Sequence, residues 1–494
     1  MPLSKPTLDK DLEKIVHVEA ATRSLSSGLA SHAIALLFLG AAGVLAGIYA
    51  GVEANTALVI FAAMLGGYMA LNIGANDVAN NVGPAVGSRA MTLTTALVIA
   101  AVFESAGALI AGGDVVSTIS KGIIDPAQVA DSQVFISAMM AALIAAALWV
   151  NLATVIGAPV STTHAVVGGV MGSGIAAVGF QLVNWSTMGA IAASWVISPI
   201  LGGAIAAMML WFIKANLIYR EDKIAAARRW IPLLIAIMAG AFACYLSVKG
   251  FKRVWKPDGL AVSMIGIGIF LLVWMIVHPL IRRQSEGMEN RNKSLRILFR
   301  IPLICSAALL SFAHGANDVA NAIGPLAAIL HSAEFGEIAT KTSVPPWIMV
   351  IGAFGISLGL FLYGPKLVRM VGDKITKMNP MRAYCVALSA AITVIIASWL
   401  GLPVSSTHIA VGAVFGVGFF REFYTSRNKQ RQEMIGQRRE TAETATPLQG
   451  SDELRHRKLV RRSHFLTIIA AWVITVPAAA VLSAVIYHAL LLLR

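Results

Sequence analysis

Gly74-Ala-Asn-Asp-Val-Ala-Asn80 is the stretch that decides the fold, and it returns letter for letter at 315–321. Each copy follows a long apolar run, so Asp77 and Asp318 are predicted to lie at membrane depth. A charged side chain at the centre of a bilayer costs from about 2.5 kcal/mol upward, so a chain that keeps two such carboxylates has a use for them. The repeat therefore indicates a duplicated site, as in transporters built from two halves.

The composition of the whole chain is that of a membrane protein. Its 494 residues are 57% hydrophobic and 13% charged, with a mean hydropathy of +0.74, which is more apolar surface than one water-soluble core can bury. The net charge of +14 falls mostly in the connections between apolar runs. The preference for basic residues on the cytoplasmic side explains this charge, so no nucleic-acid partner is expected.

Apolar runs and basic connections predict how the chain is divided. The predicted parts are a cytoplasmic N-terminal segment 1–29, an extra transmembrane helix 30–55, a first transport repeat 56–213, connecting helices and basic loops 214–299, a second transport repeat 300–420, a basic cytoplasmic loop 421–462 and a C-terminal transmembrane helix 463–494.

The basic connections also predict the topology. The connections rich in Lys and Arg are 214–229, 282–298, 366–382 and 421–462. Placing them in the cytoplasm puts the N-terminus inside and the C-terminus outside, with the basic loop 249–258 as the one poor fit. The chain then passes Asp77 while travelling inward and Asp318 while travelling outward. The two repeats are therefore predicted to be inverted relative to each other.

A second motif is duplicated as well. Gly157-Ala-Pro-Val-Ser-Thr-Thr-His164 returns as Gly401-Leu-Pro-Val-Ser-Ser-Thr-His408. The offset between the aspartates, from 77 to 318, is 241 positions, and that between the histidines, from 164 to 408, is 244. Because two unrelated motifs repeat at nearly one offset, the chain is predicted to be an all-α polytopic membrane protein. We expect an inverted-repeat secondary transporter with broken helices and re-entrant hairpins that contain the Ser/Thr residues.

The first motif is predicted to interrupt its helix and to hold a cation. Pro84 and Pro325 each remove a hydrogen-bond donor and free a carbonyl at membrane depth. In each copy the aspartate and the last asparagine are three positions apart, so they project from one helix face. Their oxygens suit a hard cation, or a proton held by the carboxylates. The candidates for binding the coupling ion are Asn76, Asp77, Asn80, Glu104, Asn317, Asp318 and Asn321, with Asp77 and Asp318 as metal ligands if the ion is Na+.

The second motif is predicted to hold an anion. A proline followed by hydroxyl residues suits the first turn of a helix, where free backbone N–H groups and the positive end of the helix dipole attract oxyanions. Helix capping is the alternative role for these hydroxyls. His164 and His408 relay protons or serve packing, and both roles stay open. The candidates for binding the substrate are Ser161, Thr162, Thr163, Ser405, Ser406, Thr407, Asn80 and Asn321.

These motifs resemble those of the inorganic phosphate transporter (PiT) family. The resemblance is carried by residues 74–88, 103–104, 121–125, 313–325 and 401–408. It implies a phosphate symporter, commonly a homodimer, with no cofactor besides its coupling ion, in which Glu104 matches a glutamate used in transport. Animal members run on sodium and carry an acid where this chain has Ala387, so Na+ and H+ both remain open. A place in the cell (inner or plasma) membrane is expected.

Three other functions compete with this expectation. A sulfate permease of the same architecture would offer the same donors to a tetrahedral dianion, and only a buried acceptor for the proton of phosphate would separate the two. A passive anion channel would not need paired cation ligands. An intramembrane aspartyl protease also uses two aspartates, but its Gly-x-Gly-Asp signature is absent at both positions. We therefore expect no enzymatic activity.

Overall fold

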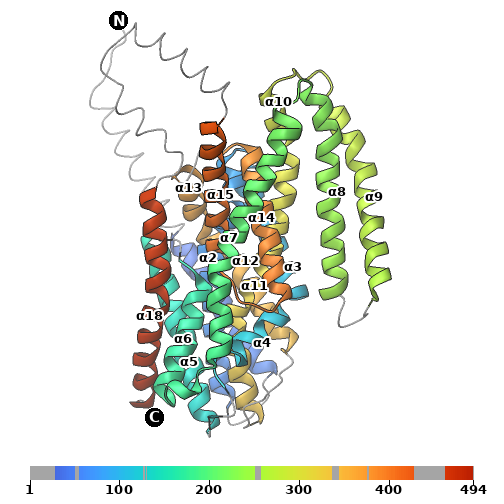
Figure 1. The fold of residues 1–494 in the computed structure, drawn as a ribbon. Coiled ribbons are helices and arrows are strands. Elements are labelled where there is room, and N and C mark those ends of the chain that lie inside the picture. Colours follow the sequence, from blue (N-terminus) through green and yellow to red (C-terminus); the bar gives the residue numbers. More distant parts are fainter. Residues whose placement is uncertain are drawn as a thin grey trace, which may run out of the picture.

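The computed structural model of the protein is a bundle of helices (Figure 1). It describes residues 28–49, 55–125, 128–129, 131–158, 160–250, 257–335, 344–374, 378–427 and 462–492. Within these ranges 10 helices are long and apolar enough to cross a membrane, and the one extended pairing is an isolated bridge between Ile124 and Val183. The predicted all-α polytopic fold is confirmed. Most of the predicted N-terminal segment and of the basic loop 421–462 lies outside the described residues.

The helices form two sets that follow the same order of long and short elements. The first set is α2 (Thr56–Gly87), α3 (Leu93–Ala111), α4 (Gly113–Lys121), α5 (Ser132–Ile156), α6 (Thr162–Ala177) and α7 (Trp185–Ile213). The second set is α11 (Arg300–Phe335), α12 (Pro346–Leu362), α13 (Gly364–Lys374), α14 (Pro380–Trp399), α15 (Ser406–Arg427) and α18 (Arg462–Leu492). The remaining elements are the helix Gly28–Tyr49 and η2 (Phe180–Leu182), η3 (Lys214–Ile218), α8 (Lys223–Lys249), α9 (Gly259–Gln284) and α10 (Asn292–Leu298).

Each set packs against the other in matching ways. α2 contacts α12 and α13, while α11 contacts α3 and α4. α7 lies against α14 and α15, and α18 lies against α5 and α6. The two sets are therefore interlocked, and the helices that carry the first motif are enclosed by helices of both sets.

α2 and α11 are in contact and run in opposite directions. Asn55, just before α2, donates from Nδ2 to the carbonyl oxygen of Ala333, near the end of α11, at 2.9 Å. Both helices continue through the first motif, with Pro84 and Pro325 inside them. The predicted interruption of the helix at this motif is therefore wrong. A proline removes one helical hydrogen bond, and the bonds around it keep these long, buried helices intact.

The glycines of the first motif allow helices to cross closely. A Cβ atom on Gly74 would lie 1.9 Å from the carbonyl oxygen of Ile356 on α12, and one on Gly315 would lie 2.0 Å from that of Glu104 on α3. No side chain fits at such a distance, so only glycine permits these crossings. The two crossings correspond, and they place Glu104 in the first set at the position that Ile356 occupies in the second.

The breaks in the helices occur at the second motif instead. Gly157 and Gly401 have φ angles of 77° and 68°, which glycine adopts without steric cost. α5 turns back on α6, and α14 turns back on α15, and the helices of each pair are in contact. Each pair is thus a hairpin whose tip carries the Ser/Thr residues, as predicted. Pro403 lies in the second tip, ahead of α15 and not in its first turn, and Pro159 is outside the described residues.

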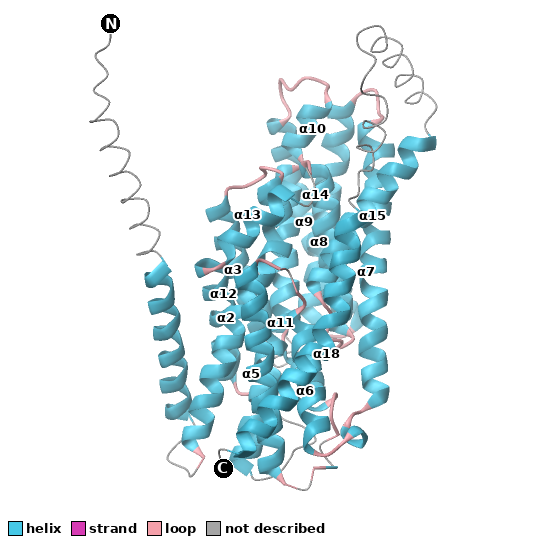
Figure 2. Cartoon of the chain, turned by 90° about the vertical axis from the view of Figure 1, so that its left-hand side faces the viewer, coloured by secondary structure: helices cyan, strands magenta, loops and turns pink. Residues whose placement is uncertain are grey.

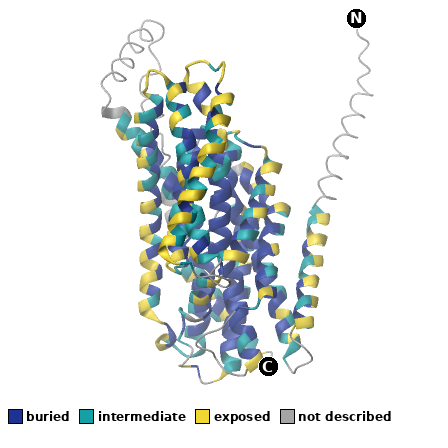
Figure 3. Ribbon diagram, turned by 90° about the vertical axis from the view of Figure 1, so that its right-hand side faces the viewer, coloured by how far each residue is buried: buried dark blue, intermediate teal, exposed yellow. Residues whose placement is uncertain are grey.

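The helix Gly28–Tyr49 packs on the outside of the bundle (Figures 2 and 3). Tyr49 stacks on Trp347 of α12, with ring centroids 5.9 Å apart. Figure 2 shows this helix at the edge of the molecule. Figure 3 shows that the centre of the bundle beside it consists mainly of buried residues.

α8 and α9 form a separate hairpin beside the bundle (Figure 1). They contact each other, and only 6% of the residues in an 18-residue apolar stretch of α9 are buried in the protein. Lys249, from the basic loop that fits the topology poorly, forms an ion pair with Asp114 of α4. Its charge is thereby compensated within the protein, which accounts for part of the poor fit.

Candidate substrate and cation site

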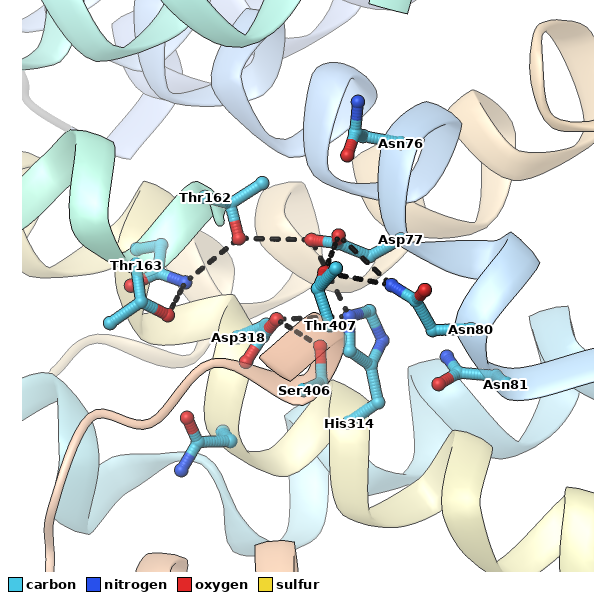
Figure 4. A network of polar contacts seen from close by, with 12 residues as sticks. Asn76, Asp77, Asn80, Asn81, Thr162, Thr163, His314, Asp318, Ser406 and Thr407 are labelled. Atoms are coloured by element: carbon cyan, nitrogen blue, oxygen red, sulfur yellow. Dashed lines mark hydrogen bonds and ion pairs between the residues drawn. The ribbon is translucent and has the colours of Figure 1, made fainter. Parts of the chain in front are cut away.

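The two first motifs and the two hairpin tips meet in one buried cluster. Asp77 on α2, Asp318 on α11 and His314 each offer one ligand atom, and these atoms lie within 4.8 Å of one another. None of the three residues is more than 1% exposed. Figure 4 shows their side chains converging with hydroxyl groups from the hairpins. The two aspartates therefore share one polar centre, as the duplicated motif predicts.

Asp77 is the more extensively hydrogen-bonded of the two carboxylates. Its Oδ2 accepts a bond from the hydroxyl of Thr162 at 2.9 Å. Its Oδ1 accepts bonds from the hydroxyl of Thr407 at 3.0 Å and from the amide of Asn80 at 3.4 Å. Thr162 begins α6 and Thr407 belongs to the first turn of α15, so Asp77 connects α2 to both hairpins.

Asp318 has fewer donors and a closer imidazole. The hydroxyl of Ser406 donates to its Oδ2 at 3.2 Å, and Nε2 of His314, one turn earlier on α11, lies 3.0 Å from the same oxygen. Within the described part of the chain, Oδ1 of Asp318 has no hydrogen-bond partner. Buried polar atoms are rarely left unsatisfied, so this oxygen is available to a cation or to a ligand that carries a proton.

Asn80 and Asn321 each bond to the hairpin of the opposite set. Nδ2 of Asn80 donates to the hydroxyl of Thr407 at 2.8 Å, and Nδ2 of Asn321 donates to that of Thr163 at 3.0 Å. Thr163 in turn donates to the carbonyl oxygen of Val404 in the other tip at 3.0 Å. The predicted hydroxyl and amide groups of both repeats are therefore brought together.

Ser161 and Ser405 act as helix caps. Their hydroxyl oxygens accept bonds from the backbone N–H groups of His164 at 3.1 Å and of His408 at 3.3 Å. The capping alternative thus applies to these two serines. The first turns of α6 and α15 still bring the positive ends of two helix dipoles to the cluster that holds the carboxylates.

A third carboxylate reaches the cluster from α3. Glu104 is fully buried, accepts a bond from Nδ2 of Asn81 at 2.7 Å and lies 3.4 Å from Nδ1 of His314. The imidazole of His314 is therefore flanked by Glu104 at one ring nitrogen and by Asp318 at the other, and Asp77 lies 3.8 Å from Nε2. His314 is therefore placed to offset part of the charge of three acids.

His314 and Asn81 are site residues that the repeat pattern does not find. The matching positions in the other copy hold Ile73 and Ala322, so a search for duplicated residues passes over both. The available signal was a histidine inside an apolar run, directly before the second copy of the motif, because titratable residues at membrane depth are functional by default.

Asn76 and Asn317 lie next to the cluster and hydrogen-bond to the first arm of the hairpin in their own set. Nδ2 of Asn76 donates to the hydroxyl of Thr154 at 3.0 Å, and Nδ2 of Asn317 donates to that of Ser398 at 2.9 Å. Figure 4 shows Asn76 directed away from the two aspartates. Each contact lies within one set, the two contacts correspond, and they give both amides a structural role. The binding of the coupling ion by Asn76 and Asn317 stays a prediction.

His164 and His408 contact each other where the hairpins meet. Their ring centroids lie 4.4 Å apart in an edge-to-face arrangement, and the ring of His164 lies 3.8 Å from that of Trp195 on α7. These contacts favour the packing role over the proton relay, which stays a prediction.

An all-helical membrane body with a buried polar centre between two interlocked sets of helices is the architecture of a polytopic membrane transporter. Comparison of the sequence with protein families gives the particular group. The model of the phosphate transporter family (PHO4) matches residues 73–483, and the chain belongs to this family.

Relatives and a solved structure agree with this assignment. A protein of Helicobacter pylori strain J99, provisionally named a phosphate permease, is 45% identical over 525 residues, covering 97% of this chain and 98% of the relative. A Pyrococcus abyssi protein with a similar provisional name is 36% identical over 427 residues, covering 86% and 96%. A solved structure named "The sodium-dependent phosphate transporter" is 35% identical with a TM-score of 0.78, covering 89% of this chain and 100% of that one.

Proposed function

We propose that this protein is a symporter that moves inorganic phosphate across the membrane together with Na+ or H+. The observation that carries the proposal is the buried cluster in which Asp77, Asp318 and His314 lie within 4.8 Å of one another, beneath hydroxyl groups from both hairpin tips. Membership of the phosphate transporter family supports phosphate as the substrate.

The hydroxyl and amide donors suit a tetrahedral oxyanion. Thr162, Thr163, Ser406 and Thr407 lie at the starts of two helices that face the cluster, where backbone N–H groups and the helix dipole add to side-chain donors. Asn80 and Asn321 supply amide groups from the opposite side. Phosphate near neutral pH still carries a proton that Oδ1 of Asp318 can accept, whereas sulfate would leave that oxygen unpaired. This difference favours phosphate over sulfate.

The coupling cation is needed because an anion and two carboxylates repel one another in a buried site. Carboxylate and amide oxygens suit Na+, and the name of the related solved structure supports that ion. Two features support H+ instead. The imidazole of His314 lies where a cation would be required, and Ala387 in α14 replaces the acid that the sodium-driven animal relatives carry. Imidazole is the side chain best suited to exchange a proton near neutral pH.

The two halves are proposed to work as inverted repeats. The opposite directions of α2 and α11 and the reciprocal bonds of Asn80 and Asn321 support this arrangement. Residues 56–213 would form the first repeat and 300–420 the second. α18 (Arg462–Leu492) would complete the second repeat in this scheme, because it packs on the first hairpin as α7 packs on the second. The homodimer and the location in the inner or plasma membrane remain predictions.

Uptake of radiolabelled phosphate into vesicles that contain the purified full-length protein tests the proposal. The Na+ gradient and the pH gradient are imposed separately, with the membrane potential clamped. We expect phosphate to accumulate above its external concentration under one of the two gradients and to be little affected by a large excess of sulfate. Equilibration without accumulation under both gradients would show a passive channel, and full competition by sulfate would show a sulfate permease.

A further inference from the structure

A cavity lined partly by basic residues lies at the base of the second hairpin, away from the cluster at its tip. It has a volume of about 80 Å³ and is lined by Lys214, Arg382, Arg421 and Asn379, together with apolar side chains from α7, η3 and α14. A water molecule occupies about 30 Å³ of liquid, so the cavity has room for a small group of a few heavy atoms.

Lys214 is held at the wall of this cavity by aromatic rings. The residue is only 8% exposed. Its Nζ lies 4.0 Å from the ring centroid of Tyr424 and 5.2 Å from that of Phe420, both on α15. The backbone here is the π-helical turn η3, an irregularity that occurs often at functional sites. The fold thus places a largely buried ammonium group beside the cavity.

The N-terminus of α14 adds to the positive charge. The side chain of Asn379 caps this helix by accepting a bond from the backbone N–H of Arg382 at 3.0 Å. Pro380 follows at the first helical position. The first turn of this 20-residue helix therefore opens at the cavity with the positive end of its dipole.

We propose that this cavity binds a phosphate group, supplied either by the headgroup of an anionic lipid or by inorganic phosphate. Two guanidinium groups, one ammonium group and a helix N-terminus are the donors that proteins use for phosphate. The three basic residues come from the connections 214–229, 366–382 and 421–462, which the sequence places in the cytoplasm. The ligand therefore reaches the cavity from the cytoplasmic side.

A bound phosphate group would contact three elements that already pack on one another. Lys214 begins η3 directly after α7, Arg382 lies in the first turn of α14, and Arg421 lies near the end of α15. α14 and α15 are the two arms of the hairpin whose tip carries Ser406 and Thr407. The ligand would add a charged link to the existing packing of this hairpin on α7. If the second hairpin moves during the proposed phosphate transport, a ligand bound at its base would restrain that movement. This consequence rests on the proposed function, whereas the binding of a phosphate group does not.

Binding is tested by comparing the full-length wild type with the double variant Arg382→Gln/Arg421→Gln. Native mass spectrometry counts the phosphatidylglycerol molecules that each protein retains. In parallel, equilibrium binding of radiolabelled inorganic phosphate is counted for protein in phosphatidylcholine nanodiscs. For a lipid ligand we expect the variant to retain one phosphatidylglycerol fewer per chain. For free phosphate we expect the number of bound ions per chain to fall from two to one, with affinity at the lost site reduced about tenfold or more.

The matched control is Arg282→Gln/Arg283→Gln, which removes the same charge from exposed positions on α9 and is expected to behave as wild type. Equal lipid retention and equal phosphate stoichiometry in the wild type and the Arg382/Arg421 variant would overturn the proposal. If that variant does not fold, the Lys214→Gln variant is tested instead by native mass spectrometry and by equilibrium binding of phosphate. Asp318→Asn separates the two sites, because it removes phosphate from the proposed transport site and leaves the cavity intact.

Discussion

Asp77 and Asp318 stand in identical motifs, yet their surroundings differ. Asp77 accepts three hydrogen bonds from hydroxyl and amide groups, while Asp318 accepts one from Ser406 and has an imidazole 3.0 Å away. The difference arises outside the motif, because His314 and Glu104 are matched by isoleucines in the other copy. The motif and its helix crossings correspond in the two sets, while unmatched residues give the two carboxylates different charge partners.

Removing either carboxylate is expected to have the largest effect on transport. Asp77→Asn and Asp318→Asn each delete a charge and weaken charge-assisted bonds worth about 1.5–3 kcal/mol, so concentrative phosphate uptake should fall about a hundredfold or more. Asp77→Asn should also lower the thermal stability of the purified protein more than Asp318→Asn does, because Asp77 connects both hairpins. Uptake in vesicles and the melting temperature in detergent measure the two effects. Near-normal accumulation in both variants would refute the shared site.

His314→Gln tests whether the imidazole compensates the three acids. Without it, Asp318, Glu104 and Asp77 face one another at close range, so we expect uptake to fall about ten- to a hundredfold. If H+ is the coupling ion, the remaining uptake should also lose its response to an imposed pH gradient. His278→Gln on α9, outside the cluster, is the control. An unchanged rate with an unchanged pH response would assign His314 a packing role only.

Glu104→Gln is expected to have a smaller effect. The glutamine keeps an acceptor for Asn81 and removes one of the negative charges beside His314, so phosphate uptake should fall about tenfold. The matched control is Ile356→Leu at the corresponding position on α12. That change conserves volume, costs less than about 1.5 kcal/mol of stability, and should leave uptake unchanged. Equal losses in the two variants would mean that Glu104 acts through packing and not through its charge.

The smallest expected effect concerns the contact between α3 and α12, which tests whether the two sets of helices are equivalent. Ser105 on α3 and Ser357 on α12 lie with hydroxyls 2.6 Å apart, and each bonds to a carbonyl of the other helix, Ala353 and Ala101. Ser105→Ala and Ser357→Ala should each lower the free energy of unfolding by about 0.6 kcal/mol. The loss in the double variant should differ from the sum of the two single losses, because the two hydroxyls contact each other. Phosphate uptake should stay nearly normal in all three variants. Clearly unequal losses of unfolding free energy in the two single variants would show that Ser105 and Ser357 are not equivalent in the two sets of helices.

The hairpins and most of the site could be predicted from the sequence. Gly157 and Gly401 precede their hydroxyl residues at matching positions, and a duplicated polar motif in an apolar chain must find a shared polar environment. For that reason Thr162, Thr407 and the two aspartates converge as expected.

The predicted interruption of the motif helices is wrong, because the local effect of Pro84 and Pro325 does not decide whether a long, buried helix breaks. A glycine and a proline in one helix indicate a break only when no neighbour compensates. Here Gly74 serves the crossing with α12, which depends on a helix far away in the sequence. The role of His314 was missed for a similar reason, since its meaning depends on α3 bringing Glu104 to the opposite ring nitrogen.

The close glycine crossings have a mechanical consequence. α2 and α11 touch α12 and α3 backbone to backbone, three residues away from the aspartates, so the carboxylates belong to a stiff frame with little freedom to slide. The hydroxyls belong to hairpin tips that are joined to this frame by side-chain bonds. An anion bound between the carboxylates and the hairpin hydroxyls would contact both the rigid helices and the hairpin tips. Release of the anion would therefore be coupled to movement of the tips away from these helices.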